Sequence, residues 1–221
     1  MMDNLLPRLK STATIRRIKK GGNVLFQGEI PRNVMIVRDG IIRAYTITST
    51  GEERIVTLYH KGDIIPLAWA LGETSTALFY YDALSDVRIL TVSKQDFLDA
   101  VMNDTQIMQQ LLRFMTTESI GLLFRINGLG QSRAIEKIGY TLYYLLFRYG
   151  TPISTDMHVI NIKMSQAVIA ELVGLTREST TKNLKVLKDK GVIDYTNSTY
   201  RVNQTKLENF LGEDAFRDLK L

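Results

Sequence analysis

Four side chains near the C-terminus have the chemistry that is needed to bind base edges in duplex DNA. They are Arg177, Glu178, Thr181 and Lys182. An arginine can make a bidentate contact to guanine O6 and N7, and a glutamate can accept from the cytosine amino group. A threonine can offer its methyl to thymine, and a lysine can reach guanine or a phosphate. Because their spacing puts them on one face of a helix, we expect these four residues to read bases.

A second set of side chains suits contacts to phosphates, which fix position without reading sequence. We expect this role for Ser165, Gln166, Ser179, Lys185, Lys188 and Arg201. The net charge of the chain is +5, and residues 161–206 carry eight Lys and Arg against four Asp and Glu. A concentration of positive charge attracts a polyanion, although an ordinary solvated basic face is the alternative.

Two short helices separated by a glycine turn are predicted to position these side chains. The Ser165 hydroxyl can accept from a backbone N–H of the first turn and so begin one helix, and Thr176 can do the same for the next. Gly174 suits the left-handed residue that ends a helix. The expected buried positions are Val168, Ile169 and Leu172 in the first helix, and Thr180, Leu184 and Leu187 in the second, over residues 177–190.

Two apolar runs after the second helix predict a β-hairpin. Residues 192–195 and 200–202 are the expected strands, and residues 196–199 join them. Two helices of this kind followed by a hairpin indicate a winged helix-turn-helix. The alternative is a plain pair of helices with solvated charges.

A long helix is predicted to begin at Asp104. An apolar stripe runs along it with the alternating four- and three-residue spacing of helices that pack in pairs: Met108, Leu112, Met115, Ser119, Leu122, Ile126 and Leu129. We expect this stripe to form a homodimer contact, although a single helix lying on its own core would show a similar pattern. Ile107, Leu111 and Phe114 form a second flank that could pack on the N-terminal part of the chain.

Two glycines, Gly128 and Gly130, are expected to interrupt the long helix and to make residues 127–131 a hinge. Ser132 suits the cap of another helix over residues 133–149. Residues 151–158 are expected to form a loop, and a short strand is expected over residues 159–163.

The N-terminal part of the chain reads as β structure from Thr14 to Val92. Apolar or alternating runs occur at residues 24–26, 34–37, 41–45, 55–59 and 87–90, with glycine turns between them. Many short strands of this kind favour an antiparallel sandwich or barrel. The fold class we expect is therefore α+β: an N-terminal double-stranded β-helix of the jelly-roll type, a long helix, and a C-terminal winged helix-turn-helix.

The segment IKMSQAVIAELVGLTRESTTK at residues 162–182 resembles the helix-turn-helix of the cyclic-AMP receptor protein/FNR family. Gly28-Glu29, Gly40 and Gly62-Asp63 are similar to the glycine turns of its barrel. The resemblance implies an effector-sensing barrel at residues 1–103, a dimerisation helix and hinge at 104–131, and a DNA-binding domain at 132–221.

The same resemblance implies a dimer that regulates transcription from a pseudo-palindromic DNA site and contacts RNA polymerase. The Arg-Glu pair of the family's recognition helix corresponds to Arg177 and Glu178. The family's next basic reader is usually an arginine, and Lys182 stands there in this sequence. Because lysine lacks the bidentate fork, we expect looser reading of that base.

The family's cyclic-AMP ligands do not carry over to this chain. Their positions, counted from Gly62-Asp63, hold Pro66-Leu67-Ala68 and Ala77-Leu78, and the base-contacting pair of the long helix becomes Leu122-Leu123. We therefore expect a different small-molecule effector in an apolar pocket, or side chains that simply fill the barrel. The expected pocket residues are Leu67, Trp69, Leu71, Leu78, Leu122 and Leu123.

No cofactor or metal site is predicted. The chain has no cysteine, which excludes a cysteine-ligated iron–sulfur cluster. Haem would need His60 or His158, and both are expected to be surface or packing residues. With one histidine in the barrel, a cupin-type metal enzyme cannot be built. We expect no enzyme, although a ligand-sensing module that does not touch DNA remains an alternative.

The composition favours a protein of the cytoplasm. No stretch reaches the roughly 18 apolar residues that a membrane span needs. The first ten residues mix polar and apolar side chains, unlike a secretory signal. We therefore expect no membrane association.

Overall fold

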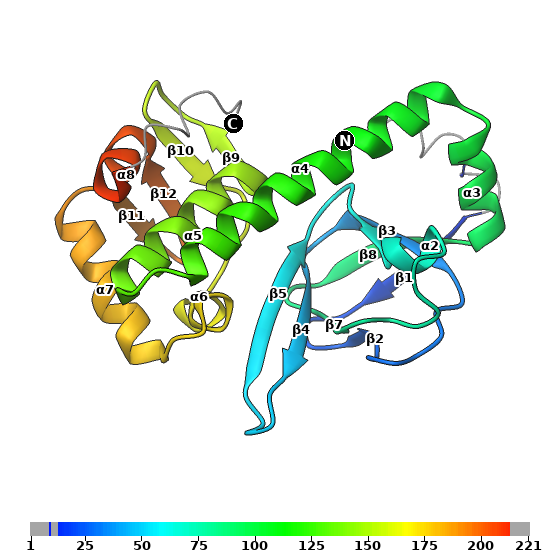
Figure 1. The fold of residues 1–221 in the computed structure, drawn as a ribbon, viewed down its shortest axis with the longest axis horizontal. Coiled ribbons are helices and arrows are strands. Elements are labelled where there is room, and N and C mark those ends of the chain that lie inside the picture. The colour runs from blue at the N-terminus through cyan, green and yellow to red at the C-terminus, as the bar shows by residue number, and fades with distance from the viewer. Residues whose placement is uncertain (1–8, 10–12, 213–221) are drawn as a thin grey trace. The chain divides into compact units, whose positions relative to one another are not determined.

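The chain divides into two compact units in the computed structural model, which describes Leu9 and residues 13–212. One unit ends at Met115 and the other begins at Thr116, so the boundary lies within α4, Thr105–Leu129 (Figure 1). The predicted long helix is therefore confirmed, and its two ends belong to different units. Asp104 begins it, because its Oδ1 accepts from Gln106 N at 2.9 Å and Ile107 N at 3.2 Å.

Two antiparallel sheets of four strands each form the first unit (Figure 1). Their core combines side chains of both sheets, such as Met35 and Ile89 from one and Ile42 and Ala83 from the other. This is the double-layered β architecture that the sequence predicts. In sheet order, the strands are β1 Thr14–Ile18, β8 Val87–Val92, β3 Val34–Asp39 and β6 Ile64–Ile65, then β2 Asn23–Leu25, β7 Tyr80–Ala83, β4 Ile42–Ile47 and β5 Glu53–Tyr59.

A second core of the first unit lies between strands and helices. It includes residues of α3, Lys94–Met102, and of the first turns of α4, with α2, Leu67–Ala70, beside them. Ser93 caps α3 by accepting from Asp96 N at 3.0 Å. The predicted second flank of the long helix is confirmed, because Ile107, Leu111 and Phe114 are buried in this core.

The second unit is built around α5, Ala134–Tyr149, which packs against the three helices and against two of the strands that follow it in the chain. Its sheet has the order β11-β12-β10-β9. The helices are α6 Gln166–Val173, α7 Arg177–Asp189 and α8 Gln204–Leu211, and the strands are β9 Gly150–Pro152, β10 Met157–Ile160, β11 Ile193–Thr196 and β12 Thr199–Asn203.

Two local predictions for this unit are wrong. Arg133, not Ser132, is the N-cap of α5, and no side chain caps that helix. The expected loop over residues 151–158 contains β9 and part of β10, which pair as a hairpin, so His158 lies in a strand. The polar composition of this segment hid the strands, because one of the two lies at the edge of the sheet and carries few apolar residues.

The expected interruption at Gly128 is also wrong, because α4 continues to Leu129. Gly128 is instead a packing position: a Cβ there would lie 2.5 Å from the Cβ of Tyr140 on α5. Gly121 lies on the same face of α4, and a Cβ there would meet Tyr144 and Arg148 of α5. These two glycines let α4 approach α5 closely.

We expect Gly128→Ala to destabilise the second unit, because the added methyl cannot fit between α4 and α5. Overpacking of this kind costs about 1–3 kcal/mol in the free energy of unfolding. Gly130→Ala is the matched control, since its nearest neighbours would be carbonyl oxygens at 3.4 and 3.5 Å. Urea denaturation measures both, and equal stability of the two variants would contradict the close-packing role of Gly128.

Candidate nucleic-acid interface

Two N-caps and one left-handed residue define the start of α6, the turn that follows it and the start of α7. Ser165 Oγ accepts from Val168 N at 3.3 Å, and Thr176 Oγ1 accepts from Ser179 N at 3.2 Å. Gly174 between them has φ 72°, a conformation that favours glycine. All three residues behave as the sequence predicts, and together they form the expected helix-turn-helix.

The two faces of α7 differ as the sequence predicts. Thr180, Leu184 and Leu187 are buried under it. Arg177, Glu178, Thr181, Lys182 and Lys185 are all exposed on the other side. The four predicted base-reading side chains are therefore accessible together. Base reading itself stays a prediction.

An open hollow of about 430 Å³ lies where α6, α7 and the β11–β12 hairpin meet. The backbone holds it together, because Met164 N donates to Ser198 O at 2.9 Å just before α6 begins. The N-terminus of α6 opens into it, and the unpaired N–H groups and dipole of a helix N-terminus favour an anion. The lining residues are Ser165, Gln166, Ala167, Arg177, Tyr195, Ser198 and Tyr200.

This hollow brings two predicted phosphate residues and one predicted base reader together, namely Ser165, Gln166 and Arg177. It also adds Ser198 and Tyr195, which the sequence reasoning missed. Ser198 belongs to residues 196–199, which the sequence predicts to join the two strands of the hairpin. There Asn197 and Ser198 take φ values of 50° and 64°, as in the tight turns of β-hairpins.

Thr181 links the two helices of the motif. Its hydroxyl lies 2.6 Å from Gln166 Oε1 and 2.9 Å from the carbonyl oxygen of Arg177, and both are acceptors. A bond to Gln166 leaves the Thr181 methyl available for an apolar contact. The contact to a thymine methyl that we expect from Thr181 therefore needs no rearrangement of its hydroxyl.

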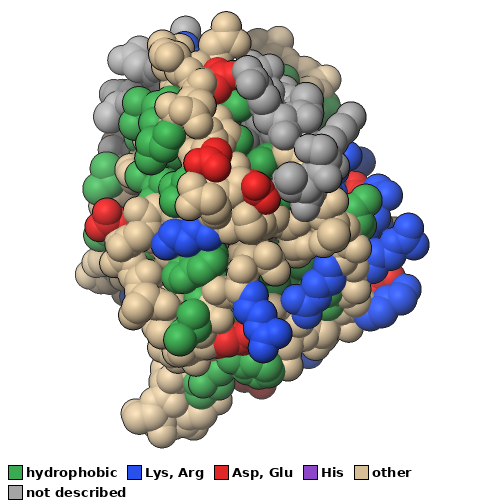
Figure 2. All heavy atoms as spheres, turned by 90° about the vertical axis from the view of Figure 1, so that its right-hand side faces the viewer, with side chains coloured by type: hydrophobic (Ala, Val, Ile, Leu, Met, Phe, Trp, Pro, Cys, Tyr) green, Lys and Arg blue, Asp and Glu red, His purple; other side chains and the backbone are tan. Residues whose placement is uncertain are grey.

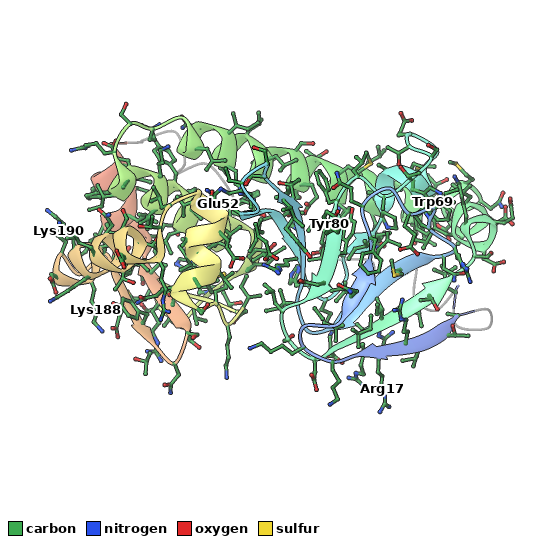
Figure 3. All side chains as sticks on the ribbon, turned by 90° about the horizontal axis from the view of Figure 1, so that it is seen from below. Arg17, Glu52, Trp69, Tyr80, Lys188 and Lys190 are labelled. Atoms are coloured by element: carbon green, nitrogen blue, oxygen red, sulfur yellow. The ribbon has the colours of Figure 1, made fainter. Side chains whose placement is uncertain are left out.

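The remaining predicted phosphate residues differ in their surroundings. Lys185 and Arg201 are exposed, and Ser179 is half-buried. Lys188, labelled in Figure 3 near the end of α7, pairs with Asp194 of β11 at 2.8 Å and lies 4.8 Å from the ring centroid of Tyr195. The hydrogen bond to Asp194 raises the pKa of Lys188 above its ordinary value and lowers that of Asp194. Lys188 thus joins α7 to the β11–β12 hairpin, which is the wing of the winged helix-turn-helix.

The first unit distributes its charge differently. On the face drawn in Figure 2, basic side chains lie next to acidic ones. Ion pairs in this unit include Lys19 with Asp86 at 2.7 Å and Arg88 with Asp39. On α7 the four exposed basic residues outnumber the two exposed acidic ones, which suits a polyanion.

The stripe predicted for dimerisation lies at the surface of α4. Met108 is partly buried against the second core of the first unit, the one that includes residues of α3 and the first turns of α4. Ser119 is exposed. Five apolar members are strongly exposed: Leu112, Met115, Leu122, Ile126 and Leu129. Single exposed apolar side chains are ordinary, but a contiguous apolar patch marks an interaction site.

The residues expected to line an effector pocket lie in different surroundings. Trp69 is buried in the second core of the first unit, and Leu67 and Leu71 pack against the same core. Lys94 Nζ donates to the Trp69 carbonyl at 2.8 Å and lies over its ring (Figure 3 labels Trp69). These three apolar side chains fill the core, which is the alternative to lining a pocket.

Leu78 and the long-helix pair do not join that core. Leu78 is about half exposed in the first unit, and Leu122 and Leu123 are exposed on the part of α4 that belongs to the second unit. The positions where cyclic-AMP-binding relatives are expected to carry a glutamate and an arginine hold the start of α2 and Ala77-Leu78. These residues do not fit a cyclic nucleotide.

The described residues offer no metal centre. Leu9 and residues 13–212 contain no cluster of three or more His, Cys, Asp or Glu side chains that could hold a metal ion. His60 Nδ1 lies 2.9 Å from Oδ2 of the buried Asp63, in the turn after β5. Within the same residues, no helix has the length and apolar character that crossing a membrane requires.

Two family sequence models match the two units. The one described as "Cyclic nucleotide-binding domain" matches residues 15–104, and the one described as "Crp-like helix-turn-helix domain" matches residues 136–210. The two ranges lie within the first and the second unit, respectively.

Curated relatives match most of the chain at low identity. The "Nitrogen fixation regulation protein FixK" of Azorhizobium caulinodans is 24% identical over 81% of this chain and 71% of its own length. The "Fumarate and nitrate reduction regulatory protein" of Vibrio cholerae is 25% identical over 83% of this chain and 70% of its own length. Both are regulators rather than enzymes, so the cupin-type alternative is set aside.

The solved structure of FixK2 from Bradyrhizobium japonicum has the same fold. Its TM-score is 0.73 at 22% identity, and the match covers 90% of this chain and 96% of that one. In this chain the two matched ranges lie on either side of α4, in the order that the sequence predicts. The chain belongs to the CRP/FNR family of transcription regulators.

Proposed function

We propose that this regulator acts in the cytoplasm as a homodimer, with one copy of α7 in the major groove of each half of a pseudo-palindromic DNA site. The observation that carries the proposal is the exposed face of α7, where Arg177, Glu178, Thr181 and Lys182 lie together. In such a site the two half-sites are separated by about 34 Å, one turn of the duplex.

Base reading and phosphate binding are divided between different residues in this proposal. Arg177 and Glu178 stand at the first turn of α7, where recognition helices contact base edges. Ser165, Gln166 and Ser198 surround the N-terminus of α6 and bind one phosphate there. Lys185 and Arg201 add phosphate contacts on either side. Lys188 contributes mainly by holding the wing through Asp194.

The exposed stripe of α4 supports the dimer. Leu122, Ile126 and Leu129 follow one another at four and three residues, the spacing at which two helices pack along each other. Pairing would remove these side chains from water, which is favourable by about 25 cal/mol per Å² of apolar surface. Contacts with RNA polymerase belong to the same proposal and follow from membership of the family.

Selection of bound sequences from random DNA tests the proposed function as a whole. We expect enrichment of an inverted repeat with half-sites one helical turn apart. A steep fall of affinity with salt should accompany it, since phosphate contacts release counterions. No enrichment, together with weak binding that ignores sequence, would show that this chain is a sensing module and not a DNA-binding regulator.

We expect Arg177→Ala to relax the preference for one guanine in each half-site, because alanine cannot make the bidentate contact. Affinity for the selected site should fall by about 1–3 kcal/mol. Arg133→Ala, which removes an exposed arginine at the start of α5, is the control and should leave the preference unchanged. Equal loss on selected and random DNA would count against base reading by Arg177.

We expect the double change Leu122→Glu and Ile126→Glu to give a monomer, because four carboxylates would face one another across the paired helices. Sedimentation equilibrium measures the change in mass, and binding to the full site should weaken because the two half-sites are no longer bound together. Ile153→Glu replaces an exposed apolar residue of the β9–β10 turn and is the control. A double variant that remains dimeric would place the interface elsewhere.

We expect cyclic AMP not to change DNA affinity, because Leu67, Ala77 and Leu78 offer neither an arginine for the phosphate nor a carboxylate for the ribose. Fluorescence anisotropy with and without an excess of the nucleotide measures this. A ligand alters DNA binding only through different affinities for two states of the protein. An increase of about tenfold, which lies within the usual range of allosteric coupling, would refute this part of the proposal.

A further inference from the structure

Arg125 is a buried arginine on α4 with a defined partner. Its residue is only 7% exposed, its Nη2 donates to the carbonyl oxygen of Leu172 at 2.9 Å, and its guanidinium carbon lies 5.5 Å from the ring centroid of Tyr144. Burial lowers the pKa of Arg125 from its ordinary value, while Tyr144 and Tyr149 oppose that shift. A buried cation is costly unless its donors are bonded, so the contact to Leu172 is a requirement of this packing.

The contact of Arg125 lies at the end of α6. The last four carbonyls of a helix have no partner inside it. Here Ala170 O accepts from Gly174 N at 2.9 Å and from Leu175 N at 3.1 Å, while Leu172 O accepts from Arg125. A cation at this end of a helix is also favoured by the helix dipole. Arg125 therefore helps to terminate α6, four residues before Thr176 caps α7.

Arg125 also lies beside the proposed dimer stripe. Gly121 and Gly128, four residues before and three after it, face α5 and allow the close approach of the two helices. The next residue, Ile126, is 67% exposed, and Leu122 is 43% exposed. Two neighbouring faces of one turn of α4 thus carry the dimer contact and the contact to the helix-turn-helix.

We propose that Arg125 is a positioning residue that fixes the turn between α6 and α7 relative to the paired long helices, and so sets the affinity for a two-fold related DNA site. The inference rests on the proposed function. In a dimer, two copies of the Arg125–Leu172 contact would hold the two α7 helices at the half-site spacing. Loss of the contact would let each turn move, and the two helices would match the duplex less often.

The test is Arg125→Met, which keeps a long apolar stem and removes the donors. Arg113→Met is the matched control, because it changes an exposed arginine on the same helix within the first unit. We expect the variant to stay dimeric in sedimentation and to bind random DNA as the wild type does. Affinity for the selected site should fall about tenfold, which lies within the usual range for coupling between a conformational equilibrium and a binding site.

Hydrogen exchange gives a second readout that separates positioning from general loss of stability. In Arg125→Met, amides of residues 172–179 should exchange faster, while those of β10 and β12 should keep the wild-type rate. A uniform increase across the second unit would mean that Arg125 only stabilises the fold, and the inference would be wrong. Arg113→Met should change neither segment.

Arg125→Lys keeps the test decisive if the methionine variant does not fold. Lysine retains the charge and one donor but lacks the planar fork, so we expect an intermediate loss of specific affinity. A folded lysine variant with wild-type affinity and exchange would overturn the inference. If the wild type itself selects no DNA sequence, the proposed function fails, and the exchange of residues 172–179 still decides whether Arg125 holds the turn.

Discussion

The candidate nucleic-acid interface depends on how α6 ends and how α7 begins. Gly174 takes a left-handed conformation that other residues rarely adopt, and Ser165 and Thr176 cap the two helices on either side of it. These local interactions fix which side chains of α7 reach the surface. Because Thr180 is fully buried, a rotation of α7 that turned Arg177 inward would expose the core beneath it.

The long helix connects this turn to the rest of the second unit through close packing. Gly121 and Gly128 bring α4 against α5, and α5 contacts α6, α7 and α8. Well-packed interiors transmit small shifts instead of absorbing them. A change in the pairing of the long helices would therefore reach α7 through α5 and through the end of α6. In the first unit, Trp69 is buried in an apolar core, and Leu67 and Leu71 pack beside it.

The features that the sequence predicted well are those set by nearby residues. Asp104, Ser165 and Thr176 all cap helices as expected, because an N-cap needs only a side-chain oxygen and an amide two or three residues away. Gly128 was misread, because a glycine that breaks a helix and one that admits a neighbouring helix look alike in a sequence. Arg125 gave no signal either, since arginines are mostly exposed and its partner is a distant backbone carbonyl.

The most direct measurement is a crystal structure of the protein bound to its selected DNA. We expect two chains joined along α4, each with α7 in the major groove and Arg177 in bidentate contact with a guanine. We also expect a phosphate at the N-terminus of α6, beside Ser165 and Ser198. A complex in which α7 lies outside the groove, or in which Arg177 and Glu178 contact no base, would show that α7 is not the recognition helix.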